Sequence, residues 1–150
     1  MRKNDQAKTI LTILPDIGRY CDGVARANHA RALASFNTCT DTQQLMESII
    51  DRAYKSQVLH NLKIKVEKQL ESAPKKLGAF ITAYFIEKKK IAQVATELGL
   101  CERTVFRKID DAIEWFATKL ERCGVTQDFF GHLILTFGWV AAIYNSTSPR

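Results

Sequence analysis

The sequence has few cysteines, and none of them stand where they could hold a metal ion together. The four are spread over 150 residues, with no C-x-x-C pair and no closely spaced histidine to complete a tetrahedral site. They are Cys21, Cys39, Cys101 and Cys123. A structural zinc is therefore not expected, no cofactor is indicated, and free thiols in a reducing, cytoplasmic setting are the simplest interpretation.

Catalytic motifs are also missing. The three histidines stand apart from one another, and neither H-E-x-x-H, nor G-x-S-x-G, nor a glycine-rich phosphate loop occurs. Asp110 and Asp111 are adjacent, so on a helix their carboxylates point to different sides and are more simply solvated than paired as acid and base. The sequence gives no support for an enzyme.

No apolar run is long enough to cross a membrane, and the N-terminus lacks the pattern of a secretory signal. The most apolar stretch, residues 129–144, has sixteen residues and includes His132, whereas a span needs about 20 apolar residues. We expect one helix here and no membrane partner. The helix is either a buried core element or a dimer interface, and its apolar face holds Phe130, Leu133, Ile134, Phe137, Val140 and Tyr144.

The charge is moderately basic and unevenly placed. Residues 1–76 hold 13 Lys and Arg against 8 Asp and Glu, a net +5, and residues 77–150 hold 9 against 8, a net +1. The total of +6 is compatible with an anionic partner such as nucleic acid, but many ordinary domains reach it.

Apolar residues recur at three- and four-residue steps, and strand-like alternation and Asn-Gly turns do not occur, so we predict an all-α protein. Helices are expected over residues 5–14 and 16–36, and over a long segment that Thr40 and Gln43 begin as a capping box. Ser72 and Pro74 mark the next break. The predicted organisation is an N-terminal helical region (1–72), a central region (73–124) and the apolar C-terminal helix with a short tail (125–150).

The central region contains a predicted bend at Gly99, in the stretch "IAQVATELGLCERTVFRKI". A positive φ costs glycine little, whereas one continuous helix would carry Gly99 at a cost of about 1 kcal/mol relative to alanine. Leu98 and Leu100 are expected to anchor the turn, and Val105 and Ile109 to face inward. A short helix, a glycine turn and a longer helix are what a helix-turn-helix requires.

Residues 83–120 resemble region 4 of bacterial sigma factors and, more loosely, the output domains of response regulators. The resemblance covers under a third of the chain. It is carried by the aromatic pair Tyr84 and Phe85, the "IAQVATELGL" block, the Thr-Val of "ERTVFRKI" and the apolar tail Ala112, Ile113, Phe116 and Leu120. It implies a helix-turn-helix that binds double-stranded DNA. Cys101 departs from it, because Ser or Thr is usual there and supplies an N-cap oxygen.

If Val105 and Ile109 face inward, the outer side of the second helix near its start holds the candidates for base contacts: Glu102, Arg103, Phe106 and Arg107. Glu102 could instead only stabilise the helix start, and Phe106 could instead be buried. Candidates for phosphate contacts are Thr104, Lys108 and the run Lys88, Lys89 and Lys90, although a lysine run can also be a solvated loop.

These features predict a sequence-specific transcriptional regulator that acts as a homodimer, because one recognition helix reads few base pairs. Two alternatives remain. The unit could be a protein-interaction module that binds RNA polymerase or another regulator, or the chain could be a minimal sigma factor. The second, polymerase-gripping domain of a sigma factor is not apparent in residues 1–72, which hold only three aromatic residues.

Overall fold

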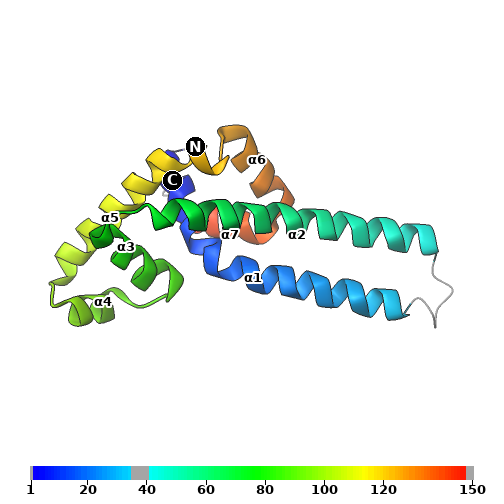
Figure 1. The fold of residues 1–150 in the computed structure, drawn as a ribbon, viewed down its shortest axis with the longest axis horizontal. Coiled ribbons are helices and arrows are strands. Elements are labelled where there is room, and N and C mark those ends of the chain that lie inside the picture. Colours follow the sequence, from blue (N-terminus) through cyan, green and yellow to red (C-terminus); the bar gives the residue numbers. More distant parts are fainter. Residues whose placement is uncertain (1, 35–40, 148–150) are drawn as a thin grey trace. The chain divides into compact units, whose positions relative to one another are not determined.

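The computed structural model describes residues 2–34 and 41–147, and within these ranges the chain is helical with no strand (Figure 1). The all-α prediction is therefore confirmed. The elements are α1 (Lys3–Ala34), α2 (Thr42–Glu71), α3 (Lys75–Ile81), the π-helical turn η1 (Thr82–Ile86), α4 (Ile91–Leu98), α5 (Glu102–Lys119), the 3-10 turn η2 (Glu121–Cys123), α6 (Gln127–Thr136) and α7 (Gly138–Thr147).

The chain divides into two compact units. We call Met1–Pro15 together with Lys65–Arg150 the compact unit, and Asp16–Ile64 the hairpin unit. These boundaries differ from the predicted ones at residues 72 and 124. Both ends of the predicted N-terminal region, residues 1–15 and 65–72, belong to the compact unit together with the central and C-terminal elements.

The predicted break before Asp16 is wrong, because α1 runs through Pro15. Proline removes one backbone hydrogen bond inside a helix, at a cost of about 3 kcal/mol. Burial offsets this cost: Leu11, Ile13 and Leu14 are at most 2% exposed. Full burial of one such side chain contributes roughly 1.5–3 kcal/mol.

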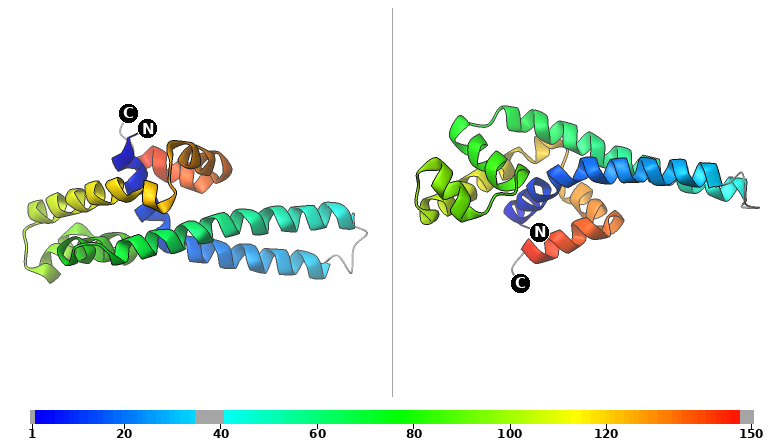
Figure 2. Two further views of the ribbon diagram at one scale, coloured as in Figure 1. Left: turned by 45° about the horizontal axis from the view of Figure 1, so that its top comes forward. Right: turned by 90° about the horizontal axis from the view of Figure 1, so that it is seen from below.

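The hairpin unit consists of the later part of α1 and the earlier part of α2, which lie side by side (Figures 1 and 2). Hydrogen bonds join the two helices. Cys21 Sγ donates to the carbonyl of Ser56 at 3.5 Å, and Asn28 Nδ2 donates to that of Ile49 at 3.3 Å. Arg31 Nη1 donates to Ser48 Oγ at 3.2 Å.

α2 begins with a side-chain cap, but the predicted capping residue, Thr40, lies outside the described residues. Asp41 Oδ1 accepts from the backbone N–H of Gln43 at 3.0 Å, which satisfies one of the free amides of the first turn. At its other end, the predicted break at Ser72–Pro74 is confirmed, because α2 ends at Glu71 and α3 begins at Lys75.

The compact unit is built around α5. α3 and α4 pack against this helix, and Phe116 in its last turn has no exposed surface. The first turns of α1 lie beside the end of α7 (Figure 2), where Thr9 Oγ1 and Thr147 Oγ1 are 3.3 Å apart. The first turns of α1 and the end of α7 therefore pack together in the compact unit.

The C-terminal stretch is two helices, so the predicted single helix over 129–144 is wrong. Phe137 is extended (φ −116°, ψ 101°) and separates α6 from α7, which are bent by 117°. The bend lets Phe130, Leu133, Phe137 and Val140 all be buried, at most 4% exposed. The core interpretation of this stretch is thus confirmed. No single helix in the described ranges is long and apolar enough to cross a bilayer, and only the bent pair α6 and α7 together would qualify by length and composition.

Candidate nucleic-acid interface

The predicted bend at Gly99 is present. α4 ends at Leu98, and Gly99 is left-handed with φ 66° and ψ 32°. The N–H of Leu100 donates to the carbonyl of Ala95 at 3.0 Å and that of Gly99 to Thr96 at 3.4 Å, which is the paired pattern of a Schellman cap. α5 then starts as a separate helix at Glu102.

The inward face of α5 is as predicted, whereas the anchors are not. Val94 and Val105 have no exposed surface, and Ile109 is 5% exposed. Leu98 and Leu100 are 43% and 39% exposed, so the prediction that they anchor the turn is wrong. An apolar residue after a Schellman cap usually packs against the residue that accepts its hydrogen bond. Here that residue is Ala95, whose side chain is too small to cover Leu100.

The outer side of α5 begins with an exposed basic face. Glu102, Arg103 and Arg107 are exposed. Phe106 is 53% exposed, so the alternative prediction that this side chain is buried is wrong. Arg103 and Arg107 are four residues apart and thus lie on one face, one above the other. Two guanidinium groups placed this way can each present a fork of donors to an acceptor pair.

This basic face is short. Asp110 and Glu114 are exposed, and helical spacing places them on the same side of α5 as Arg103 and Arg107. Carboxylates repel a phosphate backbone, so the geometry allows contact with an anion only along the first two turns of α5. The adjacent Asp111 is exposed too, as expected for a solvated side chain.

The residue before α5 carries a thiol instead of a hydroxyl, and it makes no side-chain cap. Cys101 is extended, and its Sγ lies 3.1 Å from Thr104 Oγ1. This hydrogen bond, followed by the backbone amides of the first turn, lowers the pKa of the Cys101 thiol below its usual value. Thr104 is half-buried and its hydroxyl is engaged with Cys101, which weakens its case as a phosphate contact. Lys108, also half-buried, lies one turn further on.

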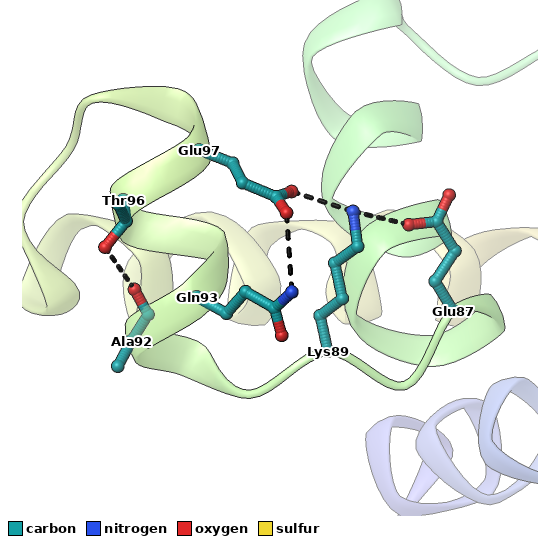
Figure 3. Close-up of polar contacts among 6 residues, drawn as sticks. All are labelled: Glu87, Lys89, Ala92, Gln93, Thr96 and Glu97. Atoms are coloured by element: carbon teal, nitrogen blue, oxygen red, sulfur yellow. Dashed lines mark hydrogen bonds and ion pairs between the residues drawn. The ribbon is translucent and has the colours of Figure 1, made fainter.

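Lys89 is not a free cation. Its Nζ lies 2.7 Å from a carboxylate oxygen of Glu87 and 2.7 Å from one of Glu97 (Figure 3). The hydrogen bond to Glu87, and then that to Glu97, raise the pKa of Lys89. Gln93 Nε2 adds a long 3.5 Å hydrogen bond to the other oxygen of Glu97. Lys89 thus ties the end of η1 to the last turn of α4, and its charge is already balanced.

The two neighbouring lysines have different surroundings. Lys88 has φ 54°, and among the described residues it is the one non-glycine with a positive φ. Lys90 is exposed and is the residue immediately before the first turn of α4, where it makes no side-chain cap. Lys90 is therefore the member of the run best placed to meet an anion at this helix end.

Metal ligands do not gather anywhere in residues 2–34 and 41–147: no group of three His, Cys, Asp or Glu side chains there could hold an ion. Comparison of the chain with protein-family models, curated proteins and solved structures finds no significant match. The resemblance to sigma region 4 therefore stays a prediction that rests on the residues themselves.

Proposed function

We propose that the chain is a sequence-specific DNA-binding transcriptional regulator of the cytoplasm, whose α5 enters the major groove. The observation that supports this most is the combination of a left-handed Gly99 with a separate α5 that exposes Arg103 and Arg107 at its start. Recognition helices of this motif contact base edges with their N-terminal residues. The acidic later turns of α5 agree with a docking that uses only that end.

Within this proposal the residues have distinct roles. Arg103 and Arg107 each pair with the two acceptors of a guanine, the commonest specific contact in the major groove. Phe106 between them contacts a thymine methyl. Lys90 meets a phosphate, which adds affinity without sequence information.

Selection of bound sequences from random duplex DNA, at two salt concentrations, tests the proposal. A recovered motif with moderate salt dependence is expected. The double variant Arg103→Ala, Arg107→Ala should bind that motif at least about 30-fold more weakly, because each bidentate pair contributes about 1–3 kcal/mol. The control Arg26→Ala, Arg122→Ala removes two other exposed arginines and should keep the preference. Steep salt dependence without any motif would mean only backbone attraction and would contradict the proposal.

We further propose that the regulator is a homodimer, paired through the hairpin unit and not through the C-terminal helices. α2 carries large apolar side chains on one outward face: Met46, Ile50, Tyr54 and Ile64 are 56%, 63%, 67% and 51% exposed. A second copy laid antiparallel would set Met46 against Ile64 and bring the two Tyr54 side chains near the twofold axis. At about 100 Å² each, the four side chains of two copies give about 800 Å², before polar neighbours add the remainder of a standard interface.

Sedimentation velocity tests this pairing. Ile50→Glu, Tyr54→Glu should convert a dimer to a monomer, since each substitution places an unpaired charge in the apolar interface. Gln44→Glu adds one negative charge at an exposed position on another side of α2 and should remain dimeric. Equal masses for all three proteins would rule out the hairpin as the interface.

One observation favours the alternative of a protein-interaction module. Three apolar side chains at the turn and the start of α5 are exposed: Leu98, Leu100 and Phe106. Such a group is typical of a surface that packs against another protein. If this alternative holds, Leu100→Ala, Phe106→Ala will abolish binding to RNA polymerase or another regulator, while Arg103→Ala, Arg107→Ala leaves it intact. Co-sedimentation with purified polymerase distinguishes the two.

A further inference from the structure

A hollow of about 530 Å³ lies in the compact unit, next to the start of α4. Two parts of the chain that are far apart in the sequence line it. Lys8 comes from α1, and the run Lys88, Lys89 and Lys90 comes from the segment between η1 and α4. The proposed function assigns Lys90 to a DNA phosphate, but it gives no reason for Lys8 to share the same concave surface.

Two of these four lysines are already engaged. Lys89 Nζ is bonded to two carboxylates, at 2.7 Å each (Figure 3), and Lys88 takes part in another interaction. Lys8 and Lys90, in contrast, form no ion pair with any residue in the described part of the chain. They are therefore the two lysines of the hollow whose charge an anion can still balance.

Lys8 lies at the edge of the core. It is half-buried, and its neighbours along α1, Ala7 and Thr9, have no exposed surface. A lysine in such a position packs its methylene stem against apolar side chains and keeps its ammonium group in water. Phe85, which is 4% exposed, lines the same hollow and offers such a surface. The stem is thus accounted for by packing, and the amine remains available in the hollow.

Both lysines stand on ordered backbone. Lys8 is in the second turn of the 32-residue α1, and its carbonyl accepts from Thr12 Oγ1 at 2.7 Å. The carbonyl of Lys90 accepts from the N–H of Val94 at 3.0 Å, and the bonds of Lys89 fasten the segment just before it. Cations on a fixed backbone lose less freedom on binding than cations on a mobile loop.

The proposed docking brings the DNA backbone to this hollow. In a helix-turn-helix the first helix crosses the sugar-phosphate backbone while the second lies in the major groove. α4 is the first helix of this motif, and the hollow lies next to its start. One strand carries a phosphate for about every 3.4 Å of helix axis, so two amines on one concave surface can meet two successive phosphates.

We propose that Lys8 binds the DNA backbone beside the phosphate that Lys90 contacts, so that the first turns of α1 belong to the DNA-binding surface. This inference rests on the proposed function and extends the interface to a segment far outside residues 83–120. A phosphate contact positions the protein and carries no sequence information. Lys8 therefore contributes affinity and register, whereas Arg103 and Arg107 select the sequence.

Titration of the selected duplex over a range of salt concentrations tests the role of Lys8. Lys8→Gln should reduce the slope of log K against log [salt] by about 0.9, the value for one phosphate contact. It should weaken binding to the selected duplex and to a scrambled duplex by the same factor, because the contact is independent of sequence. Lys8→Arg keeps the positive charge and should keep the wild-type slope.

Lys3→Gln is the matched control. It removes the same charge from the same helix, but Lys3 does not line the hollow and lies 3.8 Å from Glu121, beyond the C-terminal end of α5. The 18 residues of α5 span about 27 Å, so this control is distant from the reading end. The slope for Lys3→Gln should equal that of the wild type. The proposal is overturned if both variants lose the same slope, if Lys8→Gln keeps the wild-type slope, or if Lys8→Gln weakens only the selected duplex.

Phosphate ethylation interference is a second test that requires no change at Lys8. Ethylation should block the wild-type protein at two neighbouring phosphates of one strand, and Lys90→Gln should lose one of these positions and keep the other. A block at a single phosphate that disappears in Lys90→Gln would overturn the contact by Lys8.

The proposed function and this inference fail in different ways. If selection from random duplex DNA recovers no motif, the proposed function is wrong and the role of Lys8 is wrong with it. If a motif is recovered and depends on Arg103 and Arg107, but Lys8→Gln binds with the wild-type slope, only the role of Lys8 is wrong.

Discussion

The compact unit and the hairpin unit are both helical, but they differ in where their large apolar side chains lie. In the compact unit, large side chains such as Phe116 and Phe130 have no exposed surface. The hairpin unit also buries Ile17 and Leu59, but on its α2 Ile50 and Tyr54 are 63% and 67% exposed. The hairpin unit thus leaves large apolar side chains exposed on α2, and this is the face on which we propose that a second copy packs.

The largest expected effect is loss of the compact core. Phe116→Ala should lower the free energy of unfolding by about 3–5 kcal/mol, because it leaves a cavity at a fully buried position. Phe106→Ala removes the same side chain from the same helix at an exposed position and should cost under about 1 kcal/mol. Urea unfolding followed by circular dichroism measures both. Similar losses would mean that the described core is wrong.

A matched pair of glycines gives a smaller effect of opposite sign in the two units. Gly99→Ala should destabilise by about 1–2 kcal/mol, because alanine is strained at φ 66°. Gly23→Ala in the helical part of the hairpin should stabilise by about 0.5–1 kcal/mol. An added Cβ meets nothing within 4 Å at either position, so the difference isolates the backbone. If Gly99→Ala were also stabilising, the chain would not bend there.

The smallest effect concerns exchange of backbone amides. If hairpin opening requires the dimer to separate, a tenfold rise in protein concentration should slow amide exchange in the hairpin unit about threefold, since the dissociated fraction falls with the square root of concentration. Amides of α5 in the compact unit should be unaffected. Mass spectrometry of pulse-labelled peptides compares the two regions in one sample. Exchange rates in the hairpin unit that do not change with protein concentration would contradict the proposed dimer.

Local signals predicted the elements on both sides of Gly99 well. Gly99 and the apolar spacing of Val105 and Ile109 predicted the turn and the inward face of α5, because a left-handed glycine and a helical period are properties of short segments. The exposure of Arg103 and Arg107 followed from the same period.

Tertiary packing decided what the sequence did not predict. Pro15 is tolerated inside α1 because the residues before it are deeply buried. Phe137 is extended because the bend lets α6 and α7 both place apolar side chains in the core. The pairing of Lys89 with Glu97 joins residues eight apart across a loop and a helix, which is not a helical spacing. Lys8 meets the lysine run only in the folded chain.

The central claim is that Arg103 and Arg107 read guanine from the start of α5. Methylation interference on a selected duplex tests it most directly, because methylation of guanine N7 blocks a major-groove acceptor. Wild-type protein should be blocked at one or two guanines in each half-site, and Arg103→Ala, Arg107→Ala should lose that interference while retaining its helical content. Interference that is identical in the variant, or that is confined to the minor groove, would contradict the account.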